Sequence, residues 1–163
     1  MSAKPREGTG AAGCTAVRAA TVDDASAVLA VHRTARGAAY AHLGTPEEAA
    51  GKATLENFRI QLETAQAWVF ERDGDVIGFA VLEGELLREL YVLPDARGTG
   101  AGKALLEVAV AHGARLLWVY EDNPAARAFY ERHGWVAEPG SAYADPQWAI
   151  VEPAVRYRLG LQA

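Results

Sequence analysis

Apolar and polar positions alternate along the chain in two rhythms, one with the period of a strand and one with the period of a helix. Runs rich in β-branched and aromatic residues predict strands over 14–19, 67–72, 76–82, 85–93, 115–120, 135–137 and 155–159. Apolar residues three or four positions apart predict helices over 21–39, 45–63, 100–112 and 123–134. Residues 139–153 follow neither rhythm, and we assign them no element. The pattern indicates one α/β domain.

The first two helices are marked by the residues at their starts. Thr21 and Asp24 form a weakened capping box at the start of the first helix. Pro46 stands at the first helical position of the second helix, after Thr45 and before two acidic residues. The side chains expected to face inward are Ala27, Val28, Val31 and Ala35 in the first helix, and Leu55, Phe58 and Leu62 in the second.

The middle of the chain predicts the topology of the sheet. Short turns at Asp73-Gly74 and Glu83-Gly84 separate three strands, which we expect to form an antiparallel meander. The strand 85–93, the helix 100–112 and the strand 115–120 form a unit whose strands pair in parallel through a right-handed crossover. We therefore expect a central, mostly antiparallel sheet with one parallel β-α-β crossover, flanked by about four helices. A ligand is expected at the carboxyl ends of the parallel strands.

Three alternate glycines, at 98, 100 and 102, lie between that strand and that helix. The first turn of a helix leaves backbone N–H groups without partners, and the helix dipole adds positive charge there. Glycines let the backbone approach an anion closely, and Arg97 and Lys103 bracket the loop with charged donors. Pro94 ends the preceding strand because proline has no N–H for the ladder. The stretch therefore predicts a site for phosphate groups.

Two common phosphate loops do not fit the residues at this site. A Walker A loop needs a glycine where the chain has Arg97, and Ser or Thr where it has Ala104. The dinucleotide fingerprint needs its third glycine where Lys103 or Leu105 stands. A nucleotide-binding loop of another kind and a glycine-rich turn with no ligand remain as alternatives.

The pattern that is left, R-G-T-G-A-G preceded by V-L-P-D-A, resembles the acyl-coenzyme A loop of the Gcn5-related N-acetyltransferase (GNAT) family. A second segment, residues 123–135, is similar to the same family because it carries an Asn, a Phe-Tyr pair and Gly-Trp. Asn123 and Tyr130 are seven residues apart, nearly two helical turns, so both side chains face one side of the helix. The motifs cover residues 85–135, and the order of elements extends the resemblance to about 16–159.

The resemblance implies a GNAT-like acyl-CoA N-acyltransferase fold and a reaction. An acetyl group passes from acetyl-CoA, as co-substrate, to a primary amine of a small molecule or a lysine, by direct attack in a ternary complex. In the family, the pantetheine arm runs along the strand before the loop, and an N–H near residues 90–92 binds the oxyanion. The implied coenzyme contacts are Leu90, Tyr91, Val92, Arg97, Gly98, Thr99, Gly100, Ala101, Gly102, Lys103, Asn123 and Tyr130. Tyr130 is also the implied acid that protonates the leaving thiolate.

The base that deprotonates the acceptor amine is not fixed by a motif. Glu85 and Glu89 lie two pleats apart, so we expect them on one face of their strand. A carboxylate there could act through water, as in some members of the family, and a solvent-facing polar side of the sheet is the alternative. Tyr40 and His42 lie in the break between the first two helices, where the family often shapes its acceptor pocket. We expect His32 to be an exposed helix residue.

One departure from the family concerns the acceptor. The branch that acetylates peptide N-termini carries a glutamate five residues before the Asn, and Trp118 stands there in this chain. This substitution argues against peptide N-termini as substrates. A non-catalytic module that binds or senses coenzyme A on the same fold remains an alternative function.

Composition sets limits on partners and location. The formal net charge is −5 and no basic run occurs, so we expect no nucleic-acid partner. No apolar run of about 18 residues occurs, so we expect no membrane span. Cys14 is the sole cysteine, which excludes an intrachain disulfide framework and a cysteine-based zinc site, and we expect no metal. The N-terminus has no apolar core typical of a signal peptide, so we expect a cytoplasmic enzyme.

The expected domain organisation is simple. Residues 1–14 are small, polar and glycine-rich, which predicts a disordered leader. Residues 15–161 are the predicted N-acetyltransferase domain. Because members of the family are often dimers, a homodimer is among the expected assemblies.

Overall fold

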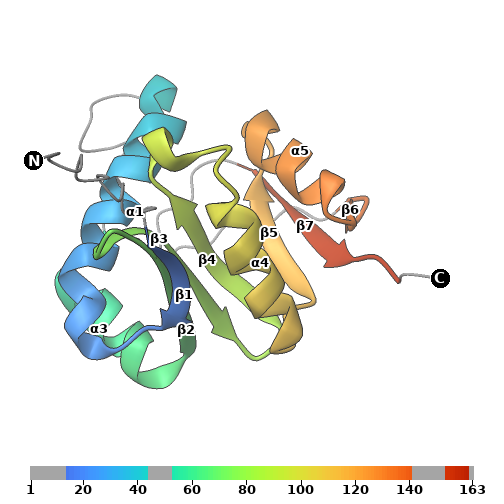
Figure 1. Ribbon diagram of the computed structural model, residues 1–163. Helices are drawn as coiled ribbons and strands as arrows, with labels where there is room; N and C mark the ends of the chain where they lie inside the picture. The colour runs from blue at the N-terminus through green and yellow to red at the C-terminus, as the bar shows by residue number, and fades with distance from the viewer. Residues whose placement is uncertain (1–13, 44–52, 141–152, 162–163) are drawn as a thin grey trace, which may run out of the picture.

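The computed structural model describes residues 14–43, 53–140 and 153–161, and within them seven strands form one sheet in the order β1-β2-β3-β4-β5-β7-β6 (Figure 1). The strands are β1 Thr15–Ala19, β2 Gln66–Arg72, β3 Asp75–Glu83, β4 Leu86–Val92, β5 Leu116–Tyr120, β6 Trp135–Ala137 and β7 Ala154–Leu159. The α-helices are α1 Ala25–Ala39, α3 Leu55–Thr64, α4 Ala101–Ala111 and α5 Pro124–Arg132. Neighbouring strands are antiparallel except β4 and β5, which are parallel. The predicted mixed sheet with one parallel crossover is confirmed.

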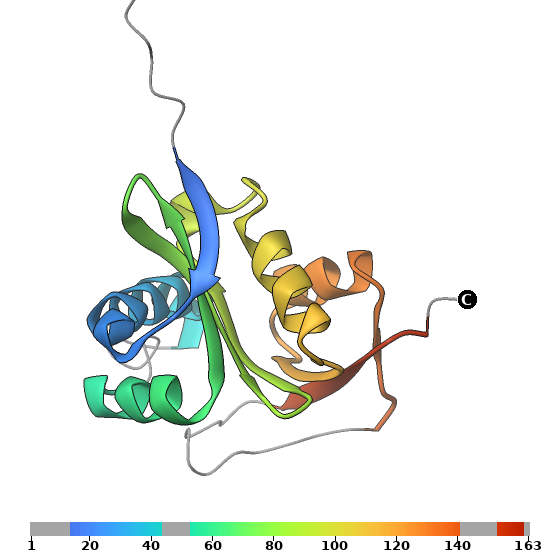
Figure 2. The same cartoon turned by 60° about the horizontal axis from the view of Figure 1, so that its bottom comes forward.

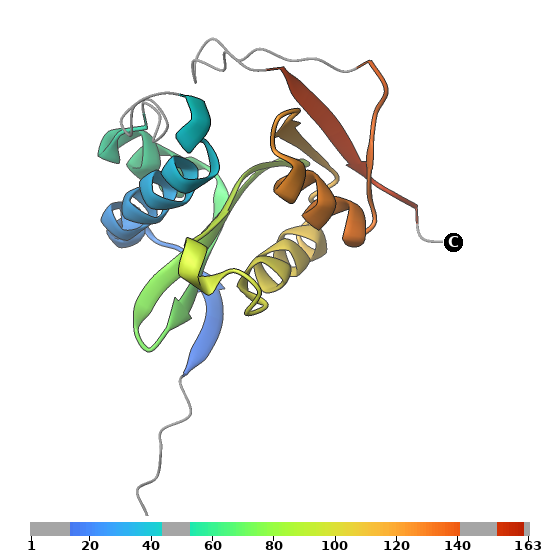
Figure 3. The same ribbon diagram turned by 90° about the horizontal axis from the view of Figure 1, so that it is seen from above.

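Helices cover both faces of the sheet. Figures 2 and 3 show α1 and α3 on one face, and α4 and α5 on the other. Each layer has its own apolar core, with Val28, Phe58 and Phe79 under α1 and α3, and Leu105 and Leu117 under α4 and α5. Burial of apolar side chains on both faces stabilises this three-layer arrangement.

The parallel pair is short, and this shortness opens the sheet. β4 and β5 pair only at Leu86–Leu116 and Leu87–Leu117, which lie at the start of both strands. Beyond these residues the strands diverge toward their carboxyl ends. Among the described residues, the backbone of β4 past Leu87 therefore has a neighbour on the β3 side and an open edge on the β5 side.

The second predicted helix differs from the observed one. The described helix α3 begins at Leu55, and the Thr54 side chain caps it by accepting the Asn57 N–H at 3.2 Å. A capping residue lies in extended backbone, so a continuous helix through 45–63 is wrong. The predicted start at Thr45-Pro46 lies outside the described residues, as do leader residues 1–13 and residues 141–152.

The first helix follows the prediction more closely. A short 3-10 turn, Val22–Asp24, precedes α1, and the Asp24 carboxylate accepts the Thr21 N–H at 2.8 Å. Val28, Val31 and Ala35 are buried, as predicted, whereas Ala27 is only half-buried. No helix in the described ranges is long and apolar enough to cross a membrane.

The register between β3 and β4 corrects the expectation that Glu85 and Glu89 share a face. Val81 pairs with Glu89, but Leu82 pairs with Leu87, so Arg88 is an extra residue in β4. Such a bulge reverses the alternation of side chains on its two sides. Glu85 is moreover exposed in the turn before β4, whereas Glu89 is buried beneath α1 and α3.

Candidate active site

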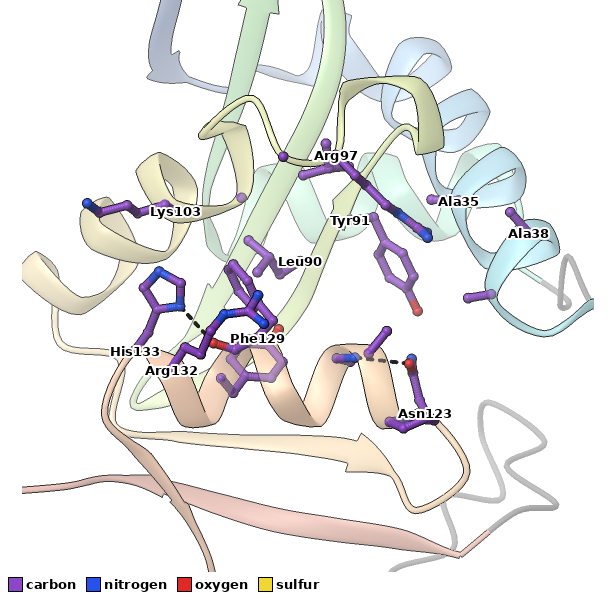
Figure 4. Close-up of a pocket in the computed structure, with 18 of the residues that line it drawn as sticks. Ala35, Ala38, Leu90, Tyr91, Arg97, Lys103, Asn123, Phe129, Arg132 and His133 are labelled. Atoms are coloured by element: carbon purple, nitrogen blue, oxygen red, sulfur yellow. Dashed lines mark hydrogen bonds between the residues drawn. The ribbon is translucent and has the colours of Figure 1, made fainter.

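A cavity of about 810 Å³ lies where β4 and β5 diverge. Its walls come from the end of α1, the end of β4, the glycine loop, the first turn of α4, and α5 (Figure 4). Ten of the predicted site residues line it: Leu90, Tyr91, Val92, Arg97, Gly98, Gly100, Gly102, Lys103, Asn123 and Tyr130. Thr99, Ala101, Glu85 and Glu89 are not part of the lining. Segments distant in the sequence thus meet at the site that the two motifs predicted.

The loop before α4 leaves backbone donors facing the cavity. Gly98 and Gly100 have φ of 78° and 91°, a backbone region that side chains disfavour, so glycine is needed at both positions. Gly100 is the residue before the first turn of α4 and brings no capping side chain. The N–H groups of residues 101–103 have no partner within the helix, because the intrahelical ladder begins with Ala104 N–H donating to Gly100 O at 3.0 Å. Together with the helix dipole they form a potential anion site.

The two cations that bracket the loop point to different rims of the cavity. In Figure 4 the Arg97 side chain runs from the loop toward α1, whereas Lys103 points to the far side of α4. Lys103 lies 3.8 Å from Glu107, one helical turn on, and both side chains are exposed. Thr99 bonds with its hydroxyl to the Ala96 carbonyl, and Ala101 is buried, so neither side chain faces the cavity. Contacts from these two residues therefore come only from their backbone.

The open edge of β4 offers a second set of backbone groups. Leu93 N–H donates to Ile77 O on β3 at 2.8 Å, and Tyr91 is paired with Phe79. Alternate residues of an antiparallel strand direct their backbone groups to opposite sides. The N–H and C=O groups of Leu90 and Val92 therefore face the opening toward β5, where a peptide-like ligand would extend the ladder.

Helix α5 brings Asn123 and Tyr130 to the opposite wall. Asn123 Oδ1 accepts the Ala126 N–H at 3.1 Å and so caps α5, while its Nδ2 donates to the Tyr40 hydroxyl at 3.1 Å. In the part of the chain that the structure describes, the other N–H of this amide has no protein partner and could contact a ligand. Tyr130 is buried against Phe129 and Trp135, and burial raises its pKa well above the ordinary value. Its hydroxyl therefore keeps its proton at neutral pH.

An aromatic cluster lies at the α1 end of the cavity, and sequence reasoning found only part of it. Arg36 lies 4.8 Å above the Tyr40 ring and 5.4 Å from the Tyr120 ring, and it donates to the Tyr120 hydroxyl at 3.4 Å. The two rings meet edge to face at 4.8 Å, and burial raises the pKa of Tyr40 to about 12. Arg36 and Tyr40 are one helical turn apart, so their proximity could have been predicted from the sequence. Tyr120 is distant in the sequence and reaches them only in the folded structure.

Glu89 and His32 form a buried polar layer behind Tyr91. Burial raises the pKa of Glu89 to about 7. The neighbouring Arg88, Gln61 and Arg36 lower this pKa, but they offset only part of the effect of burial. His32 is 4% exposed and packs edge-on to Tyr91, so the prediction of an exposed residue is wrong. Burial, with help from nearby arginines, lowers its pKa to about 4. The side of α1 that faces the sheet is wide enough to bury both His32 and Val28.

A histidine and a carboxylate meet at the mouth of the cavity. His42 Nε2 lies 2.7 Å from Asp122 Oδ2, and both residues line the cavity. His42 was expected near the acceptor, but Asp122 was missed. Its position directly before the Asn123 cap was the available signal.

These features suit a ligand that carries phosphate groups and a peptide-like arm. A protein-family model described as "Acetyltransferase (GNAT) domain" matches residues 63–137. The Escherichia coli K12 protein named peptidyl-lysine N-acetyltransferase YiaC is 41% identical over 101 residues, which cover 58% of this chain and 68% of YiaC. The chain belongs to the GNAT family of acetyltransferases.

Two further comparisons define how far the likeness extends. A Streptomyces griseus protein named mycothiol acetyltransferase is 37% identical over 131 residues, which span 69% of this chain and only 39% of that protein. The solution structure of apo YjaB from Escherichia coli has a TM-score of 0.71, with 23% identity over 91% of this chain and 99% of YjaB. The predicted family, fold and acetyltransferase activity are confirmed. The roles of the individual site residues stay predictions.

Proposed function

We propose that the protein transfers an acetyl group from acetyl-CoA to a primary amine, on a lysine or a small molecule, by direct attack in a ternary complex. One observation carries the proposal: the uncapped start of α4, the open edge of β4 and Tyr130 all line one cavity. The start of α4 suits a diphosphate, and the open edge of β4 suits a pantetheine arm. Tyr130 can serve as a proton donor.

The coenzyme follows the backbone of β4 and its loop. The N–H groups of residues 101–103 bind the diphosphate, and Arg97 and Lys103 approach it from the two rims. The amides of the pantetheine arm pair with the free groups of Leu90 and Val92. One of these N–H groups also polarises the thioester carbonyl and stabilises the oxyanion that forms when the amine attacks.

Tyr130 completes the transfer. The leaving thiolate has a pKa near 8–9 by analogy with cysteine, so a nearby proton donor lowers the barrier to its departure. Because burial keeps the Tyr130 hydroxyl protonated, the donor is in the required state at neutral pH. Tyr130 is only 8% exposed in the cavity wall. A water molecule could therefore replace Tyr130 as proton donor only in part.

The acceptor enters from the α1 side, opposite the glycine loop. The relatives named for peptidyl-lysine and for mycothiol acetylation support a primary amine or an amine-bearing small molecule in general terms. Because these relatives are named for acetyl transfer, they give no support to a non-catalytic module. Tyr40, His42 and Tyr91 line the part of the cavity that we assign to the acceptor.

The test is release of free thiol from acetyl-CoA across a panel of amines. The panel contains a peptide with a blocked N-terminus and a single lysine, free amino sugars and polyamines. The Tyr130→Phe variant should bind coenzyme A like the wild type but turn over more slowly. Tight coenzyme binding without turnover on any amine would contradict the transferase, and absence of coenzyme binding would contradict the site.

A further inference from the structure

The proposed reaction needs a group that accepts a proton from the acceptor, because an amine is an ammonium ion at neutral pH and attacks only when neutral. We infer that this base is His42, oriented by Asp122. The inference rests on the proposed amine acetylation, and it assigns to the reaction a residue pair that lies apart from both motifs of the coenzyme site.

Few side chains in the lining can accept a proton at neutral pH. Among the described residues of the cavity wall, the acids and imidazoles are His42, Asp122 and His133. His133 bonds through Nδ1 to the Phe129 carbonyl at 2.7 Å and lies beside Lys103 on the coenzyme side (Figure 4). Tyr40 and Tyr130 hold their protons, because burial raises both pKa values. Glu89 is not part of the cavity lining. The His42–Asp122 pair is therefore the remaining candidate base on the acceptor side.

The hydrogen bond of this pair fixes which ring nitrogen is free. An ionised carboxylate can only accept hydrogen bonds, so at 2.7 Å the His42 Nε2 carries the proton and donates it to Asp122 Oδ2. The lone pair of the neutral ring is then on Nδ1, which can take a proton. The imidazolium that forms keeps its negative partner, an arrangement that favours a histidine as base.

The surrounding structure holds both partners at the cavity. Tyr40, two residues before His42, accepts a hydrogen bond from Asn123, the residue after Asp122. The Tyr40 ring lies 6.3 Å from the His42 ring and packs edge-on against Tyr120. The titratable and charged groups around His42 among the described residues are thus Asp122, Tyr40 and, behind Tyr40, Arg36 and Tyr120. The pair itself is about half exposed, at 48% and 59%, so a proton can pass on to solvent.

The proton balance of the reaction closes without another reagent. The acceptor ammonium gives one proton to His42 Nδ1, and the neutral amine attacks the thioester carbon. A C–N bond forms, the C–S bond breaks, and the thiolate takes the Tyr130 hydroxyl proton. The N-protonated amide then returns a proton to the Tyr130 oxygen, and His42 releases its proton to water. The products are the acetylated amine, the free thiol and one proton.

The experiment follows kcat/KM from about pH 5 to 9, the range in which imidazoles change charge, with acetyl-CoA and the blocked single-lysine peptide. His42→Gln keeps a donor for Asp122 but has no basic nitrogen. We expect kcat/KM to fall about 100-fold at neutral pH and the decline toward acid pH to disappear, with the affinity for coenzyme A unchanged. Asp122→Asn should cause a smaller loss, and added imidazole should restore part of the activity of His42→Ala.

The controls separate this inference from the proposed function. His112→Gln changes an exposed histidine at the end of α4, outside the cavity wall, and should match the wild type. If the wild type acetylates no amine of the panel, the proposed function fails and the base fails with it. If the wild type is active but His42→Gln keeps the acid decline, the inference is wrong. The same holds if Glu89→Gln removes that decline and His42→Gln does not.

Discussion

The two faces of β4 offer opposite chemistry within a strand of seven residues. Toward α4 and α5, Leu90 and Val92 pack as apolar side chains, and their free backbone groups face the opening beside β5. Toward α1 and α3, Glu89 and Tyr91 bury ionisable groups, with His32 packed against Tyr91. The open edge of β4 beside the first face can bind a ligand through its backbone alone. The second face holds side chains whose protonation is controlled by burial.

This contrast implies two kinds of sensitivity to change. Backbone donors carry no titratable group, so substitutions at the glycine loop should weaken coenzyme binding equally at every pH. Buried acids and bases tie their protonation to folding, so substitutions on the α1 face should alter how stability depends on pH.

Gly100→Glu should nearly abolish coenzyme binding. The substitution places a side chain where φ is 91° and brings a negative charge beside the N–H groups that we assign to the diphosphate. We expect coenzyme A to bind about a thousandfold more weakly, a loss of about 4 kcal/mol. Isothermal titration calorimetry with coenzyme A at two pH values measures it.

Gly113→Glu is the matched control, because Gly113 has φ of 110° at the other end of α4. Both variants should lose about 1–2 kcal/mol of folding stability from the left-handed backbone, but only Gly100→Glu should lose the coenzyme. Undiminished coenzyme uptake by a folded Gly100→Glu protein would contradict the assignment of the α4 start.

The part of the site that the sequence predicted is the part that is local in the chain. A strand end, a proline, alternate glycines and a helix start follow one another over residues 90–103, and each has a conformational requirement that can be recognised from its residue type. Eight of the ten predicted residues that line the cavity therefore come from this one stretch. The same local reasoning predicted the antiparallel meander and the one parallel crossover, because short turns and a single intervening helix leave few alternatives.

The other face depends on contacts between distant elements, which residue types alone do not specify. The extra residue at Arg88 breaks the alternation that placed Glu85 and Glu89 together. His32 is buried because Phe58 and Tyr91 close over it from α3 and β4. Asp122 meets His42 across 80 residues of sequence. Each of these errors or omissions concerns a side chain whose partner lies on another element.

Glu89 and His32 have opposite effects on how folding stability depends on pH. Burial raises the pKa of Glu89 from 4.5 to about 7, so its contribution is full below 4.5 and is lost as pH rises to 7. Burial lowers the pKa of His32 from 6.5 to about 4, so its contribution is full above 6.5 and is lost as pH falls to 4. Each contribution is about 3 kcal/mol, and the two slopes cancel between about pH 4.5 and 6.5.

Single substitutions should expose the two slopes. Relative to the wild type, Glu89→Gln should gain stability as pH rises through this range, because the His32 slope remains. His32→Leu should lose stability over the same range, because the Glu89 slope remains. Urea denaturation at a series of pH values measures the difference. Parallel curves for all three proteins would show that these groups do not titrate as the burial implies.

Tyr130→Phe should slow the reaction about 100-fold through loss of the proton donor, with coenzyme affinity kept. The effect should persist across neutral pH, because burial keeps this hydroxyl protonated there. Tyr157→Phe is a control in the core between β7 and α5, outside the cavity lining, where the Tyr157 hydroxyl bonds to Arg127 and Glu131 at 2.9 and 2.8 Å. It should lower the melting temperature without a comparable fall in kcat. Equal falls in kcat would mean that the placement of α5, rather than the Tyr130 proton, limits turnover.

The smallest expected effect is at Asn123, where the start of α5 contrasts with that of α4. The Asn123 side chain already caps α5 and holds Tyr40, so this helix start has fewer free donors for an anion than α4 has. Asn123→Ala removes both bonds and should cost about 1–2 kcal/mol of stability. Asn123→Asp keeps a capping oxygen but cannot donate to Tyr40, so it should recover most of that loss. Coenzyme affinity, measured by the same calorimetry, should fall far less in either variant than in Gly100→Glu, because each removes only one side-chain N–H that could contact the coenzyme. A loss of coenzyme affinity as large as that of Gly100→Glu would mean that the starts of both α4 and α5 bind the coenzyme. The assignment of the coenzyme to the α4 start and the edge of β4 would then be wrong.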